Sequence, residues 1–197
     1  MTQEFYQTKT SNNSAVDQSL WQAFLNGDEK AYEKLYNKYI DALFRYGSMF
    51  SRNRELTEDA IHDVFTNIWK SKEHLSSASS VKLYLFSSLK RQLLRRLKKE
   101  RPYVFMGDVD HYFPLQMVPS VLDEEINESD RKALAKKIEK CLKLLSNRQR
   151  EIIYLKFNQD LSYHEIANLL DLDQKYVYNT ASNAFCKLRE LTSFLIY

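Results

Sequence analysis

The three prolines of this 197-residue chain, Pro102, Pro114 and Pro119, lie within one 18-residue stretch. The chain also has only three glycines. Proline and glycine are the residues that most often interrupt helices, so the segments on either side of this stretch can form long helices. Apolar residues recur in those segments with the 3.6-residue period of an amphipathic helix. The sequence therefore predicts an all-α fold with two small helical modules.

The proline-containing segment 102–129 is predicted to be the linker between the modules. Residues 102–130 include seven acids and neither lysine nor arginine. With little means of forming a core, this linker is expected to be extended and poorly ordered in the free protein unless the two modules pack together. The predicted organisation is a flexible tail over 1–18, a first module over 19–101 and a second over 130–197.

Composition places the chain among ordinary globular proteins, with 44% hydrophobic and 28% charged residues. The net charge of +3 is too small to indicate a partner. Cys141 and Cys186 are isolated and lack metal-ligand spacing, so both are interpreted as small buried residues. There is no signal peptide and no apolar run long enough to span a bilayer, and a cytoplasmic protein is expected.

The first module contains a helix with one acidic side. Thr57 is predicted to cap this acidic helix, and Asp28 is predicted to cap the helix that precedes it in the chain. Its acidic side carries Asp59, His62 and Asp63, together with a further glutamate. A metal site is disfavoured because no second histidine is within helical reach, and a catalytic pair would lack a nucleophile. A solvated helix start and a docking surface for a basic partner remain as alternatives.

A serine-rich loop leads from this acidic helix to a basic one, which runs from Val81 to about Arg101. Ser79 or Ser80 is expected to cap the basic helix. Its second half, KRQLLRRLKKER, carries seven basic residues against one acid. A basic helix that follows aromatic residues is suited to binding nucleic-acid phosphates while bases stack beside it.

The second module ends in a predicted helix-turn-helix between Leu161 and Leu191. Ser162 and Glu165 form a Ser-x-x-Glu capping box, and Ser146 and Gln149 form another capping box at the start of the preceding helix. Asp173 can cap the second helix of the hairpin. That helix has a narrow apolar stripe opposite a polar side. Such a hairpin can place its second helix in the DNA major groove, although ordinary helical hairpins share the pattern. The polar side carries Gln174, Lys175, Tyr178, Asn179, Ser182 and Asn183.

The two modules in this order resemble a bacterial RNA polymerase sigma factor of the extracytoplasmic-function (ECF) group, within the sigma-70 family. LSNRQREIIYLKFNQDLSYHEIANLLDLD is similar to region 4, TEDAIHDVFTNIW to region 2.2, and VKLYLFSSLKRQLLRRLKK to regions 2.3 and 2.4. A helix-turn-helix regulator that binds DNA without the polymerase core is the alternative, but it would need a receiver or ligand domain. An enzyme acting on nucleic acid would need a catalytic constellation, which the sequence lacks.

The resemblance implies three sets of binding residues and no catalytic residue, metal or cofactor. It also implies that region 4 docks on the polymerase β flap and that an anti-sigma factor, commonly membrane-bound, regulates the protein. Tyr84 replaces the family's usual tryptophan, His62 its usual glutamine, and Lys90-Arg91 its usual Arg-Asn. For the β′ clamp helices of the polymerase, the implied residues are Asp59, His62 and Asp63. For the −10 element they are Ser76, Ser77, Ser79, Ser80, Lys90, Arg91, Arg95 and Arg96, and the serine loop is implied to capture a flipped base. For the −35 element they are the six residues on the polar side of the second helix of the helix-turn-helix, listed above.

Overall fold

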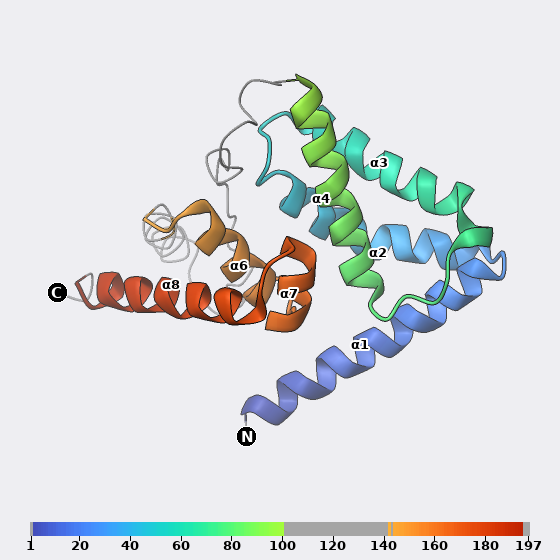
Figure 1. Cartoon of the computed structure of the whole chain (residues 1–197). Helices are drawn as coiled ribbons and strands as arrows, with labels where there is room; N and C mark the ends of the chain where they lie inside the picture. Colours follow the sequence, from blue (N-terminus) through green and yellow to red (C-terminus); the bar gives the residue numbers. More distant parts are fainter. Residues whose placement is uncertain (1, 101–141, 143, 195–197) are drawn as a thin grey trace, which may run out of the picture. The chain divides into compact units, whose positions relative to one another are not determined.

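The computed structural model describes residues 2–100, 142 and 144–194, with side chains placed over 14–99, 142 and 144–189. The described residues form helices and turns, with no strand among them, which confirms the all-α fold. The chain separates into two compact units, 1–107 and 108–197 (Figure 1). The predicted linker over 102–129 and residues 130–141 of the predicted second module, Cys141 among them, lie outside the described residues. Within the described part, no helix is long and apolar enough to cross a membrane.

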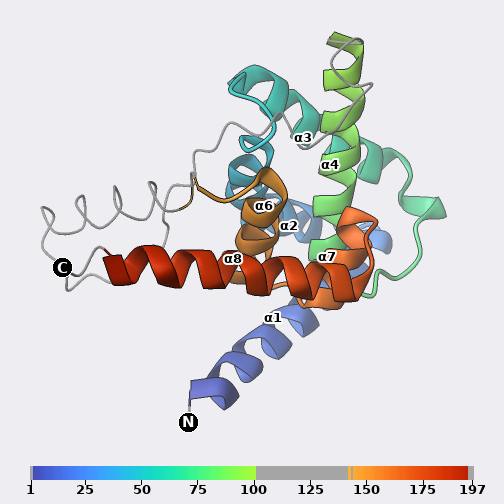
Figure 2. The same cartoon turned by 60° about the vertical axis from the view of Figure 1, so that its left-hand side comes forward.

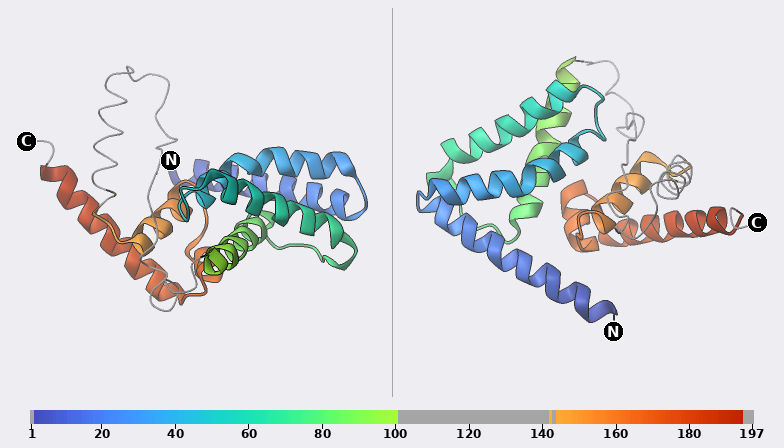
Figure 3. Two further views of the ribbon diagram at one scale, coloured as in Figure 1. Left: turned by 90° about the horizontal axis from the view of Figure 1, so that it is seen from above. Right: turned by 180° about the vertical axis from the view of Figure 1, so that it is seen from behind.

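The first unit consists of four α-helices and one short 3-10 helix. Helices α2 and α3 lie side by side, and α4 crosses both of them, while α1 packs along α2 (Figures 1 and 3). The elements are α1 (Thr2–Leu25), α2 (Glu29–Gly47), α3 (Arg54–Lys70), η1 (Lys72–His74) and α4 (Val81–Glu100).

Helix α1 is longer than the sequence indicated. It runs without interruption from Thr2 to Leu25, whereas the sequence predicted a flexible tail over 1–18. Buried Asp17, inside the supposed tail, accepts hydrogen bonds of 2.5 Å from both the Tyr39 hydroxyl and the Lys38 ammonium of α2. Burial, followed by the hydrogen bond to Asp17, raises the pKa of Tyr39 above its ordinary value.

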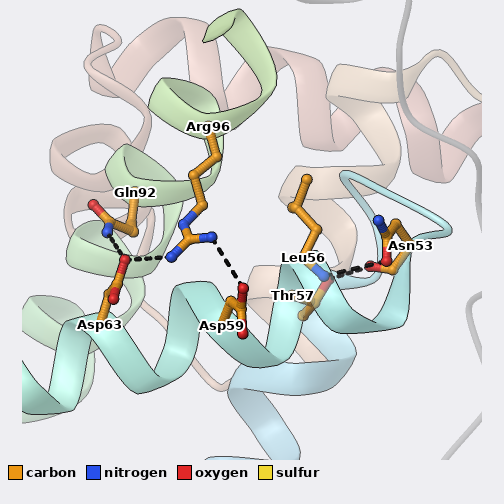
Figure 4. Close-up of polar contacts among 7 residues, drawn as sticks. All are labelled: Asn53, Leu56, Thr57, Asp59, Asp63, Gln92 and Arg96. Atoms are coloured by element: carbon orange, nitrogen blue, oxygen red, sulfur yellow. Dashed lines mark hydrogen bonds and ion pairs between the residues drawn. The ribbon is translucent and has the colours of Figure 1, made fainter. Parts of the chain in front are cut away.

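The turns of the first unit follow local capping chemistry. Gly27 has φ of +98°, which lets the chain reverse after α1, and Asp28 then caps α2 as predicted. The predicted cap of α3 is wrong. Asn53 is the N-cap, accepting from the Leu56 amide at 3.2 Å, and α3 begins one turn before Thr57 (Figure 4). Thr57 is instead fully buried, and its hydroxyl donates to the Asn53 carbonyl.

A chain of touching aromatic rings joins the four α-helices of the first unit. Trp21 of α1 contacts Tyr84 of α4, with ring centroids 5.3 Å apart, and also Phe24, at 5.5 Å. Phe24 lies against Tyr32 of α2 and Trp69 of α3, at 5.4 and 6.1 Å. Aromatic pairs at these separations add to the stabilisation from burial, so this cluster fixes how the helices meet.

The second unit contains α6 (Asn147–Phe157), α7 (Tyr163–Leu170) and α8 (Gln174–Phe194) (Figure 2). The capping boxes predicted from Ser146 and Ser162 are both present. Asp171 adopts a left-handed conformation, with φ of 56°, and ends α7. Asp173 then accepts from two amides at the start of α8, as predicted. The predicted stripe of α8 is confirmed: Val177, Ala181 and Ala184 are buried and Leu188 is partly buried.

The packing of α2 against α3 depends on Gly47. A Cβ at this position would lie 2.5 Å from the Thr57 Cγ2, which no ordinary contact allows. We therefore expect Gly47→Ala to lower the free energy of unfolding by about 1–3 kcal/mol in urea denaturation, less what alanine gains in helix propensity.

Thr57→Ser is the matched partner for this substitution, because it removes the Cγ2 and keeps the hydroxyl. In the double variant Gly47→Ala/Thr57→Ser, alanine should cost little or nothing relative to Thr57→Ser alone. An equal cost in both backgrounds would contradict the proposed close contact.

Candidate functional site

The outer side of α3 exposes acids and a histidine, as the sequence predicted. Glu58, Asp59 and His62 are exposed, whereas Asp63 is half-buried and lies toward α4. The Glu58 carboxylate pairs with the guanidinium of Arg54, one turn earlier on α3, at a nitrogen–oxygen distance of 2.7 Å. This side of α3 therefore offers negative charge to a partner mainly through Asp59, with His62 beside it.

Asp63 belongs to a polar cluster that connects α3 to α4 (Figure 4). Its Oδ2 accepts a hydrogen bond of 2.5 Å from the Gln92 side chain and an ion-paired hydrogen bond from Arg96. Arg96 also lies 3.4 Å from Asp59. The hydrogen bond from Arg96, the largest influence, holds the pKa of Asp63 below its ordinary value despite some opposition from burial. Sequence analysis missed Gln92, because the pattern of one helix does not show which residues face another.

The side chain of His62 lies one turn before Thr66, its Nε2 3.5 Å from the threonine hydroxyl. Among the described residues, no group of three or more histidines, cysteines or acids is placed to hold a metal ion. The geometry of α3 accordingly leaves the solvated helix start and the docking surface as the two interpretations of its acidic side.

The basic residues in the second half of α4 divide into two sets. Lys90 is 8% exposed, and Arg96 is paired with α3 as described above. Arg91, Arg95, Lys98 and Lys99 are exposed, and their spacing places them along one side of the helix. The side chains of this second set are turned toward solvent, whereas Arg96 is paired with acids of α3. We call these four residues the basic stripe.

The serine loop, residues 75–80, precedes α4 and leaves most of its hydroxyls accessible. Ser80 caps α4 by accepting from the Leu83 amide at 3.2 Å, which decides between the two predicted caps. Ser76, Ser77 and Ser79 are exposed. A groove lies next to the loop between α3 and α4, and its lining includes Leu75, Tyr84, Ser88, Arg91 and Arg95. Two members of the basic stripe therefore border this groove.

Helix α8 presents the whole predicted polar side to solvent. Gln174, Lys175, Tyr178, Asn179, Ser182 and Asn183 are all exposed. The opposite stripe is buried, so the helix is anchored along one side and free along the other. A helix held in this way can enter a DNA groove without losing its packing.

Aromatic residues border the polar side of α8. Tyr178 packs edge-on against Tyr163 of α7, with ring centroids 5.4 Å apart, and burial raises the pKa of Tyr163. Cys186 is exposed on α8, so the prediction of a buried cysteine is wrong at this position. The reason is helical phase: Cys186 comes two residues after buried Ala184, a rotation of about 200° around the helix.

Comparison with known families matches both units. Residues 35–103 match Sigma-70 region 2, and residues 135–188 match Sigma-70 region 4. The chain belongs to the sigma-70 family. It is also similar to the RNA polymerase sigma factor NccH of Alcaligenes xylosoxydans xylosoxydans, at 27% identity over 90% of this chain and 95% of that protein. These matches confirm the resemblance to an ECF-type sigma factor.

Two solved structures share the fold of this sigma factor. CnrH, in complex with the cytosolic domain of CnrY, aligns with a TM-score of 0.59 at 20% identity, over 90% of this chain and 97% of CnrH. RpoE of Bartonella quintana, in complex with the anti-sigma factor NepR, aligns with a TM-score of 0.58 at 22% identity, over 83% of this chain and 98% of RpoE. At these identities the likeness concerns the fold.

The contact between Asp63 and Arg96 predicts a pH dependence. A carboxyl with a lowered pKa in the folded protein contributes stability above its unfolded-state pKa of about 3.9 and loses it as pH falls through the folded value. We expect Arg96→Met to raise the pKa of Asp63 and to remove this acid-sensitive contribution. A carboxyl carbon NMR titration measures the shift.

Arg95→Met is the control, because Arg95 lies one residue away and bonds to Gln92 rather than to Asp63. It should leave the pKa of Asp63 close to that of the unmodified protein. Equal titration of Asp63 in the unmodified protein and in Arg96→Met would show that the ion pair does not persist in solution.

Proposed function

We propose that this sigma factor binds core RNA polymerase through α3 and directs transcription initiation through two DNA-binding surfaces, one in each unit. The observation that carries this proposal is the presence of region 2 and region 4 in one chain. A regulator that binds DNA without polymerase core would account for the helix-turn-helix but not for region 2. In this account the polymerase supplies the chemistry and the sigma factor supplies binding and positioning, without a catalytic residue of its own.

We assign polymerase binding to Asp59, His62 and Asp63. Asp59 and His62 form the contact surface, and Asp63 supports it. The Asp59 side chain is 60% exposed, so it can meet basic groups of the β′ clamp helices besides its contact with Arg96. His62 extends the same surface. Asp63 supports the surface from inside, because its carboxylate already accepts from Gln92 and Arg96 of α4.

The −10 surface combines the basic stripe with the serine loop. Basic side chains neutralise phosphates and make binding dependent on salt, whereas base selectivity needs contacts to the base itself. We assign Arg91 and Arg95 to phosphates beside the groove, and the hydroxyls of Ser76, Ser77 and Ser79 to a base taken out of the stack. Ser80 caps α4, Lys90 is buried and Arg96 is paired with Asp63 and Asp59, so we assign these three to shaping the surface rather than to contacting DNA.

The −35 surface is the polar side of α8. The helix has 21 residues and is about 31 Å long, enough for its first turns to enter the major groove while the rest packs against α6. Asn179 can bond bidentately to adenine, and Lys175 in the first turn can reach a guanine edge or a phosphate. Gln174, Tyr178, Ser182 and Asn183 flank them. This set lacks arginine, so we propose an A/T-leaning −35 element.

We also propose regulation by an anti-sigma factor, since RpoE was solved with NepR and CnrH with the cytosolic domain of CnrY. The anti-sigma factor can be membrane-bound, while the sigma factor acts in the cytoplasm, where polymerase and promoter DNA are found. Region 4 is proposed to dock on the β flap.

Docking through α3 predicts the effect of reversing Asp59. Asp59→Lys places a like charge against a basic partner, which should weaken binding to core polymerase at least about tenfold, or ~1.4 kcal/mol. Fluorescence anisotropy of the labelled full-length protein with core polymerase measures this affinity.

Two controls separate docking from other effects of this substitution. Arg96→Met breaks the same contact to α4 without changing the outward acids, and Glu33→Lys makes the same charge change on an exposed position of α2. Both should bind core within about twofold of the unmodified protein. If Asp59→Lys binds as they do, α3 is not the docking helix.

The −35 assignment predicts a local change of sequence preference. Asn179→Ala should cost about 1–3 kcal/mol at a single base position and relax the preference there, because it removes a bidentate contact. Transcription from a library randomised in the −35 element measures this preference. Asn168→Ala, an exposed amide on α7, is the control and should keep the preferred sequence. An unchanged −35 preference in Asn179→Ala would remove this residue from the reading surface.

A further inference from the structure

Helix α1 holds the serine loop by its main chain. The indole N–H of Trp21 donates to the Ser76 carbonyl at 3.2 Å, and the Gln18 side-chain amide donates to the Ser79 carbonyl at 3.2 Å. Both bonds connect residues more than fifty positions apart in sequence. They engage carbonyl groups only, so the exposed serine hydroxyls remain available to a ligand.

These donors are themselves fixed from several sides. Trp21 is 2% exposed and its ring lies against Tyr84, which also lines the groove beside the loop. One turn before Trp21, the buried Asp17 ties α1 to α2 through Tyr39 and Lys38. The ends of the loop are held differently, by η1 at Leu75 and by the cap of α4 at Ser80. Helix α1 therefore constrains the part of the loop between those ends.

We propose that Gln18 and Trp21 are positioning residues for −10 selectivity. They fix the path of the loop main chain and so determine where the hydroxyls of Ser76, Ser77 and Ser79 meet a base. Taking a base out of the stack costs a few kcal/mol, and a loop that is already ordered offsets this cost better than a mobile one. This inference rests on the proposed −10 role of the loop. It assigns part of that role to α1, which precedes the segment matched to region 2.

The test uses Gln18→Met and Trp21→Phe, separately and together, in the full-length protein bound to core polymerase. Methionine keeps the length of the glutamine and phenylalanine keeps an aromatic ring, but neither donates the hydrogen bond. The matched controls are Gln22→Met, one turn along α1 at an exposed position, and Trp69→Phe, in the same aromatic cluster. The readout is transcription from a promoter library randomised in the −10 element, together with the salt dependence of promoter binding.

We expect each variant to reduce discrimination at one −10 position by about two- to tenfold, the range that one net hydrogen bond supplies. Core affinity and the slope of binding against salt should stay unchanged, because the basic stripe is intact. A loss of activity that is equal on every −10 sequence, or that Trp69→Phe reproduces, would show a merely structural role and overturn the proposal. Gln18→Met changes an exposed residue, so it tests the inference even if Trp21→Phe melts at a lower temperature.

The same experiment separates this inference from the function on which it rests. If the unmodified holoenzyme shows no −10 preference, the proposed role of the serine loop fails. If the unmodified holoenzyme discriminates and the double variant discriminates equally well, the loop keeps its role and the positioning by α1 is wrong.

Discussion

The aromatic cluster of the first unit is the constraint on which its other features depend. Trp21, Phe24, Tyr32, Trp69 and Tyr84 form ring contacts that join α1, α2, α3 and α4. These large side chains fix the distances between the helices through their own volume. The cluster determines where α3 presents its acids and where α4 presents its basic stripe. It also brings an indole N–H to the main chain of the serine loop.

The cluster of Asp63, Gln92 and Arg96 pairs some of the opposite charges of α3 and α4 with one another and leaves others facing solvent. Asp63, Gln92 and Arg96 bond to one another between the helices, whereas Asp59 of α3 and the basic stripe of α4 face solvent with opposite charges. An ion pair between partly exposed side chains contributes only modest stability. Under the proposed function, the acidic side of α3 binds polymerase and the basic stripe of α4 binds DNA, so the two partners do not compete for the same groups.

The sequence predicted features that depend on local chemistry and helical period. Both capping boxes, the Asp28 and Asp173 caps and the buried stripe of α8 are set by residues a few positions apart, and all are present. Contacts between helices were not predictable in this way. Thr57 resembles a cap but is buried against Gly47, and Arg96 belongs to a basic run but pairs with α3. Residues 1–18 show no apolar period, yet α1 is helical there and Asp17 is buried against α2.

We propose that this chain gives core polymerase its promoter specificity. The most direct test is run-off transcription by purified core polymerase on a template library randomised at −10 and −35, with and without the full-length protein. Binding of the same library by the protein alone is measured in parallel. We expect transcripts only when the protein is present, enriched for one combination of −10 and −35 sequences, and weak, poorly selective binding by the free protein. Tight, selective binding by the free protein, with no transcripts from core polymerase, would instead identify a regulator that acts without the polymerase core.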